Sequence, residues 1–378
     1  MRLGVWTVVL FMAIGTCLAE GLKTVAEAAD RAVIGQKALA GLSERERILS
    51  QPQLFPAGQS ISDWTAMAFA LQGMQEDYSA YLESLAQHVT QQYATEERLS
   101  ALKATEWHRI ALTVLALGGD PRAFGVDPEG TAIDLIADGT YSYVNQDLEA
   151  QGLNGLIFAL ITLDAGDYVV PEDSLYTRVS LVQAILDRQN ADGGFSLAAN
   201  GSSDVDITAM ALQALAPYRE EQAREAVQRA LTYLSGEQDH DGNFANRYGK
   251  SSESAAQVVI ALCALGLDPD TTEQFQKAGG SVLDALLSYQ QQDGSFAHGS
   301  EEPGDFTATE QALLALTAAE RFYAGEPALY QLSASRPGGE TGRSDRSWII
   351  WCAVGGVAAL CLLTVVIVGV RKMRGGKS

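Results

Sequence analysis

Carboxylates, amides and one guanidinium recur at matched positions in the apolar segments of this 378-residue chain. When these segments are superposed as helices, one stripe with the spacing 0, 3 and 7 stays polar, and this spacing defines a single helix face. A polar stripe on a buried helix must meet a partner or water, so we predict that it faces a cavity. The ligand-binding candidates on this stripe or one column beside it are Trp64, Glu106, Trp107, Arg109, Asp206, Gln213, Gln257 and Glu310.

These side chains suit a polar or cationic molecule with some flat apolar area. Some of the acids have a second explanation, because Ser62-Asp63 and Thr105-Glu106 place a hydroxyl before an acid in a first helical turn. That arrangement caps free backbone N–H groups and complements the helix dipole. The deeper candidates do not fit capping, and for the two tryptophans the alternative is a place in the core.

The elements that position these residues come from an internal repeat. Segments 189–195 (QNADGGF), 238–244 (QDHDGNF) and 290–296 (QQQDGSF) superpose directly, and residues 138–141 (DGTY) form a weaker copy. We predict that the Gln bonds the last carbonyls of a helix. The Gly takes a positive φ and reverses the chain, while the Phe pins the turn onto the core. The signature is therefore structural.

An apolar helix is predicted after each turn, two further apolar helices have no such turn before them, and amphipathic helices lie between the six. The apolar helices begin near Thr65, His108, Asn154, Thr208, Ala256 and Thr309. The amphipathic ones cover residues 22–42, 78–93, 175–189, 219–238 and 272–290, among others. Buried and half-exposed helices in alternation predict an all-α fold, an α/α6 toroid with six inner and six outer helices. The alternative, an open solenoid, would leave its terminal hairpins with uncovered apolar faces.

Composition and the two end segments predict a membrane-anchored surface protein. Residues 1–19 are typical of a signal peptide, 20–332 form the toroid and 333–347 a stalk. Residues 348–370 suit a transmembrane helix and 371–378 form a basic tail, which places the C-terminus in the cytoplasm. Without these ends 47 acidic residues face 21 basic ones, a net charge near −26. This charge argues against nucleic acid and anionic lipid surfaces as partners.

The repeated Gln-x-x-Asp-Gly-x-Phe signature over residues 50–325 resembles the repeats of squalene cyclases and protein prenyltransferases. The resemblance implies the α/α6 toroid but no single activity, because the same fold serves isoprenoid cyclases, prenyltransferase β subunits and cobalamin carriers of the intrinsic-factor type. Similarity to those carriers makes a corrinoid one possible ligand.

Two activities of these families can be compared with the residues present. Alkene-protonating cyclases carry Asp-x-Asp-Asp-Thr, and residues 204–208 read DVDIT, so Asp206 matches the proton donor while Ile207 replaces the last acid. Prenyltransferases bind zinc through Asp, Cys and His. Here Cys263 lies within a predicted helix and Phe306-Thr307 stands where a His-Thr pair would be. We therefore predict no metal site.

The predicted function is a non-catalytic toroid at the cell membrane that binds a small molecule or a partner in its axial opening. One alternative is a terpene-cyclase-like or prenyltransferase-like enzyme with Asp206 as the acid. The other is a scaffold that binds a protein or a glycan through loops on the rim.

Overall fold

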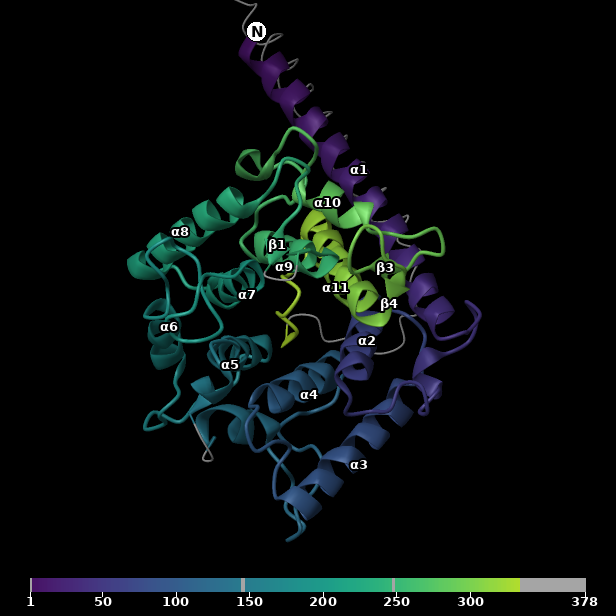
Figure 1. The fold of residues 1–378 in the computed structure, drawn as a ribbon, viewed down its shortest axis with the longest axis vertical. Coiled ribbons are helices and arrows are strands. Elements are labelled where there is room, and N and C mark those ends of the chain that lie inside the picture. The colour runs from purple at the N-terminus through teal and green to yellow at the C-terminus, as the bar shows by residue number, and fades with distance from the viewer. Residues whose placement is uncertain (1, 144–146, 247–248, 334–378) are drawn as a thin grey trace, which may run out of the picture.

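Six inner helices form a closed ring in the computed structural model, which describes residues 2–143, 147–246 and 249–333. Each inner helix packs against the next, and the last packs against the first. In ring order they are α2 (Ser60–Leu71), α4 (Thr105–Ala116), α5 (Asn154–Ala165), α7 (Val205–Leu215), α9 (Ser252–Ala264) and α11 (Phe306–Ala324). The predicted closed toroid is confirmed, and the open solenoid is excluded because α11 packs on α2 (Figure 1).

Side chains cap the first N–H groups of α7, α9 and α11, whereas α2, α4 and α5 begin without a side-chain cap, so Ser62 and Thr105 do not cap their helices. The Asp204 carboxylate accepts from the N–H groups of Asp206 and Ile207 at the start of α7. Ser251 caps α9 and Asp305 caps α11 in the same way. At the other end of α11, Gly325 takes the left-handed conformation and stops the helix. The apolar residues of all six helices join one continuous core.

The outer layer is less regular than predicted. It contains α1 (Arg2–Leu39), α3 (Tyr78–Glu96), α6 (Arg178–Leu186), α8 (Glu221–Glu237) and α10 (Val282–Ser288). The prediction of a helix over 272–290 is wrong in its first half, because the short 3₁₀ turn η4 (Glu273–Phe275) is followed by a turn at Gly280, whose φ is 153°. Between α4 and α5 the outer position holds only the π-helical turn η2 (Ala137–Tyr141), which packs on α4.

Two further 3₁₀ turns and two short β-hairpins complete the chain. The 3₁₀ turns are η1 (Ile48–Ser50) and η3 (Leu148–Gln151). Antiparallel pairs join β1 (Ala245–Asn246) to β2 (Gly249–Lys250) and β3 (Phe296–Ala297) to β4 (Gly304–Asp305). The second hairpin lies directly before α11 and leads the chain into the ring.

The signature turns join neighbouring repeats. The Gly residues have φ values between 83° and 92°, and Phe195, Phe244 and Phe296 are fully buried, as predicted. The Gln has other partners than expected. Gln238 Nε2 donates to the Gly242 carbonyl of its own turn (3.1 Å) and to the Phe275 carbonyl of the next repeat (3.0 Å). The equivalent Gln189 and Gln290 make the same pair of bonds, so each signature Gln ties one repeat to the next.

Replacing Gln238 with Ala therefore removes two buried hydrogen bonds and leaves two carbonyls unsatisfied. We expect a loss of about 1–3 kcal/mol in the free energy of unfolding, measured by urea denaturation. Gln228→Ala, on the exposed face of α8, is the control and should change stability by less than about 0.5 kcal/mol. Equal effects of the two substitutions would contradict the role of Gln238 as a link between repeats.

The segment after α11, residues 326–333, turns back into the ring, and we call it the strap. Arg321 Nε donates to the Pro327 carbonyl (2.8 Å), and the Leu332 N–H donates to the carbonyl of Ala165 at the end of α5 (3.1 Å). Leu329 and Leu332 are buried. In ring order α5 lies opposite α11, so the strap crosses the axis, where the end of the described chain is visible in Figure 1.

The structure describes only some of the predicted end segments. Residues 2–19, predicted as a signal peptide, form the first half of α1, while the predicted transmembrane segment 348–370 and basic tail 371–378 lie outside the described residues. Within the described ranges no helix combines the length and apolar character needed to cross a membrane.

Candidate functional site

A cavity of about 230 Å³ lies on the axis of the ring. It reaches the first residues of α2, α4 and α5, so it extends to the N-terminal ends of these helices. Its lining consists of Ser60, Trp64, Thr105, Glu106, Arg109, Asn154, Phe158, Met210, Gln257, Glu310, Gln311, Leu314 and Tyr330. Of the eight predicted ligand-binding residues, Trp64, Glu106, Arg109, Gln257 and Glu310 meet here.

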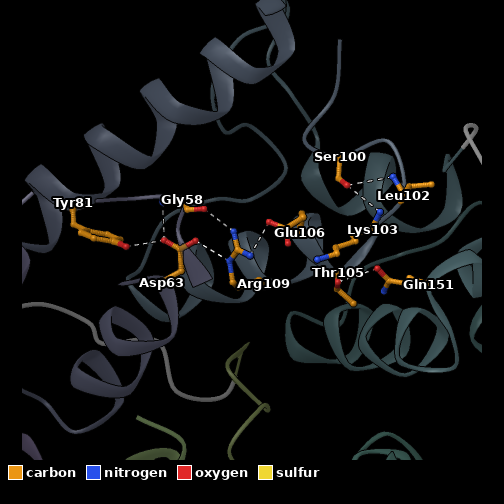
Figure 2. Close-up of polar contacts among 10 residues, drawn as sticks. All are labelled: Gly58, Asp63, Tyr81, Ser100, Leu102, Lys103, Thr105, Glu106, Arg109 and Gln151. Carbon is orange, nitrogen blue, oxygen red and sulfur yellow. Dashed lines mark hydrogen bonds and ion pairs between the residues drawn. The ribbon is translucent and has the colours of Figure 1, made fainter. Parts of the chain in front are cut away.

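Arg109 is the centre of a buried network at one side of this cavity (Figure 2). Its Nε donates to Asp63 Oδ2 (3.0 Å), its Nη1 to Glu106 Oε2 (2.7 Å) and its Nη2 to the Gly58 carbonyl (2.8 Å). Tyr81 Oη and the Gly58 N–H both donate to Asp63 Oδ1, at 2.7 and 3.0 Å. Each of the three guanidinium nitrogen atoms of Arg109 therefore donates to a protein group.

The charges of this network follow from its contacts. Burial lowers the pKa of Arg109, but Asp63 and Glu106 raise it by more, so the net direction is upward. Burial raises the pKa of Asp63, and Arg109, Tyr81 and Gly58 lower it without cancelling that effect. Asp63 accepts from three donors, which match a carboxylate rather than a protonated acid. One cation thus faces two carboxylates, Asp63 and Glu106.

Glu310 is the second acid in the lining of this cavity, beside Glu106. It is 4% exposed, and among the described residues its Oε2 has no hydrogen-bond partner. Burial and the nearby Asp63 carboxylate raise the pKa of Glu310 well above its usual value, although Arg109 opposes them. Arg109 is already shared by two carboxylates, so it offsets only part of the effect of burial on the pKa of Glu310.

Amide side chains continue the polar stripe across the next helices. Gln213 Nε2 on α7 donates to Gln257 Oε1 on α9 (2.9 Å), and Gln257 Nε2 donates to Gln311 Oε1 on α11 (3.2 Å). Gln213 itself lines a second cavity of about 90 Å³ near the C-terminal ends of α7 and α9. Tyr330 lines both cavities, so the strap stands between them and closes the larger cavity on that side.

The two predicted tryptophans have different surroundings. Trp64 lines the cavity with Phe158, with ring centroids 6.2 Å apart. Trp107 is 1% exposed and packs edge-on against Tyr143, and its Nε1 donates to Tyr93 Oη (2.8 Å). Trp107 therefore lies in the core, with its one polar atom used by the protein.

Asp206, the sequence match to the cyclase acid, is the second residue of α7 and is half-buried. It is not among the residues that line either of the two cavities described. Asp204 caps α7 and Ile207 is a buried apolar residue, so neither neighbour supplies the additional acid of the cyclase motif.

Eight lining residues were not among the predicted candidates, namely Ser60, Thr105, Asn154, Phe158, Met210, Gln311, Leu314 and Tyr330. Phe158, Met210 and Gln311 lie one position from predicted stripe residues, and a wider stripe would have included them. Tyr330 had no signal in the sequence, because nothing local in residues 326–333 indicates that the strap crosses the ring.

The fold and the cavity define an α/α toroid with an acidic, partly aromatic axial site. Residues 198–324 match the squalene-hopene cyclase C-terminal domain, a region that includes Asp206, Gln257 and Glu310. A drimenyl diphosphate synthase from Streptomyces showdoensis is 31% identical over 170 residues, which are 43% of this chain and 32% of that protein. The chain thus spans about a third of the length of this curated relative.

Among solved structures, the fold is similar to the Candida albicans protein geranylgeranyltransferase-I complexed with GGPP. The TM-score is 0.52 and the identity 15%, over 78% of this chain and 91% of the other. This likeness concerns the fold alone. With the domain match, it confirms the resemblance to the squalene-cyclase and protein-prenyltransferase toroid superfamily that the repeats predicted.

Proposed function

We propose that the chain is a terpene-cyclase-like enzyme that binds a short, neutral isoprenoid in its axial cavity and cyclises it after protonating a double bond. The observation that carries the proposal is the pairing of a buried carboxyl, Glu310, whose pKa is raised by burial, with an aromatic cavity wall. The match of residues 198–324 to a cyclase domain supports it. An enzyme of this kind was the alternative function predicted from the sequence, and these observations favour it over a non-catalytic binder.

The lining suits carbocation chemistry. A cation formed in the cavity would lie near the faces of Trp64, Phe158 and Tyr330, and cations are attracted to aromatic faces. The excess negative charge of Asp63 and Glu106 over Arg109 adds electrostatic stabilisation in a site of low dielectric. Leu314 and Met210 supply apolar contact for the hydrocarbon.

The charge of the cavity also restricts the substrate. Arg109 is the one cation among the described lining residues, and each of its guanidinium nitrogen atoms already donates to Asp63, Glu106 or the Gly58 carbonyl. A diphosphate group would meet carboxylates without a free cation, which is unfavourable. The relative named above is a diphosphate synthase, so this chain would differ from it in the head group of its substrate.

The volume of the axial cavity also restricts the substrate. Ligand pockets commonly measure about 300–1,000 Å³, and this cavity of about 230 Å³ is smaller. It favours a short isoprenoid alcohol over squalene, and it is too small to enclose a corrinoid. The strap prevents extension of the cavity towards the C-terminal ends of the inner helices.

The test is incubation of the purified full chain with farnesol, geranylgeraniol, squalene and farnesyl diphosphate, followed by gas chromatography and mass spectrometry of the products. We expect a cyclised isomer from a neutral alcohol and none from the diphosphate. Absence of product from all four substrates, in preparations whose folding is confirmed by circular dichroism, would sink the proposal.

A second candidate is the non-catalytic ligand binder first predicted from the sequence. The observation that favours it is Ile207, a buried apolar residue where the cyclase motif has an acid. In that case one of the alcohols should raise the melting temperature of the protein and be recovered unchanged. A binder of proteins or glycans on the rim would instead show no shift with any of the four molecules.

We further propose that the toroid is exported and anchored in the cell membrane by residues 348–370, with residues 371–378 in the cytoplasm. The support is the uncharged composition of the first segment and the basic residues of the second. In intact cells, added protease should degrade the toroid while a C-terminal epitope stays protected. Recovery of the full chain in the soluble fraction would contradict the anchor.

A further inference from the structure

We infer that Glu310 on α11, rather than Asp206, is the proton donor of this site. The inference rests on the proposed function and assigns its central chemical role. Asp206 matches the acid of the cyclase motif, but the residues that line the axial cavity include Glu310 and not Asp206. A general acid must reach the atom that it protonates, so position in the cavity decides between the two carboxyls.

The contacts of Asp63, Glu106 and Glu310 separate their roles. Asp63 accepts hydrogen bonds from Arg109, Tyr81 and Gly58, and Glu106 accepts from Arg109. The three donors around Asp63 match a carboxylate. Glu310 Oε2 is buried and has no such donor among the described residues. With one guanidinium already facing two carboxylates, a third negative charge would be unsupported, and Glu310 is the acid that keeps its proton.

The protonation step balances within the substrate and the protein. The Glu310 hydroxyl gives its proton to the less substituted carbon of an alkene, the π electron pair forms the new C–H bond, and Glu310 becomes a carboxylate. The π pair of a second alkene then attacks the cationic carbon and closes the ring. The final cation loses a proton to water, and water returns a proton to Glu310. The product is an isomer of the substrate, so no oxidant or reductant is needed.

The surroundings of Glu310 compensate for the weakness of a carboxylic acid towards an alkene. When Glu310 loses its proton, its new charge lies in a cavity that also holds the carbocation, and the two form an ion pair. Trp64, Phe158 and Tyr330 line the same space and stabilise the cation from the sides. Arg109 lies close enough to lower the pKa of Glu310 and so favours the charged product of the transfer.

The test compares Glu310→Gln, Asp206→Asn and Glu302→Gln in the full chain. Glu302 is exposed, so Glu302→Gln makes the same chemical change away from the cavity. With a neutral isoprenoid alcohol that the wild type cyclises, Glu310→Gln should lower turnover about 10²–10⁴-fold, the usual contribution of a general acid, without loss of substrate binding in a thermal-shift assay. Asp206→Asn and Glu302→Gln should keep most of the activity. In D₂O the wild-type product should gain one deuterium.

An infrared difference spectrum of the wild type minus Glu310→Gln, at neutral pH, supplies a readout besides turnover. It should contain the C=O band of a protonated carboxylic acid, which shifts on transfer to D₂O. Absence of this band, or full turnover by Glu310→Gln, overturns the inference. If the band is present but the wild type cyclises none of the tested isoprenoids, the proton assignment holds and the proposed function fails.

Discussion

Replacement of Arg109 by Met should cost about 3–5 kcal/mol of the free energy of unfolding, the usual effect of removing one partner of a buried ion pair. Asp63 is 0% exposed and Arg109 6% exposed, so water cannot replace the guanidinium. The variant would leave the Asp63 carboxylate with two neutral donors, Tyr81 and Gly58, and no cation. Since domains are stable by only about 5–15 kcal/mol, urea denaturation at pH 7 should show a large shift.

Two further variants isolate the cause of this loss. Arg224→Met on the exposed face of α8 removes a comparable side chain and should change stability by less than about 0.5 kcal/mol. The double variant Asp63→Asn with Arg109→Met removes the orphaned charge and should recover part of the loss. If Arg109→Met alone costs under about 1 kcal/mol, the network does not carry the charges assigned to it.

The same network explains how far the sequence could predict the site. The 0, 3, 7 stripe correctly placed Glu106, Arg109, Gln257 and Glu310 on one cavity, because helical geometry is local and repeats in each inner helix. It could not assign their protonation. The raised pKa of Glu310 follows from its burial and from Arg109 being engaged elsewhere, and that engagement depends on the Gly58 and Asp63 contacts of a different helical hairpin.

The failures have separate reasons. Trp64 and Trp107 are both one position from the stripe, but Trp107 does not line the cavity, because it turns towards Tyr93 and Tyr143 in the core. The sequence did not predict the path of the strap, because the strap interacts with residues that are distant in the chain. Its Leu332 bonds to Ala165 on the opposite side of the ring, and no pattern within residues 326–333 records that partner.

The sequence predicted those parts of the fold that the burial of apolar residues determines. The inner helices are apolar on most faces and had to be enclosed, which gave the ring. The outer positions face water on one side and tolerate irregular backbone, so η2 and the turn before α10 replace regular helix without exposing the core. The predictions therefore held for the inner ring and failed in parts of the outer layer.

The stability difference between Glu310→Gln and the wild type should grow as pH rises above about 4.5, the ordinary pKa of a glutamate. The pKa of Glu310 is raised in the folded state by burial and by Asp63, so the folded protein keeps a proton that the unfolded chain releases. The stability contributed by this proton is complete below pH 4.5 and is lost as pH rises through the folded pKa. The slope is about 1.4 kcal/mol per pH unit.

Glutamine cannot ionise, so the variant lacks this loss and should gain on the wild type in urea denaturations from pH 4.5 upward. Any constant cost of the new amide cancels, because only the change of the difference with pH is compared. His88 titrates nearby with a pKa lowered chiefly by burial, but it is present in both proteins. A difference that stays flat between pH 4.5 and pH 7.5 would mean that Glu310 is ionised in the folded ring, and the cavity would then contain no neutral acid to start a cyclisation.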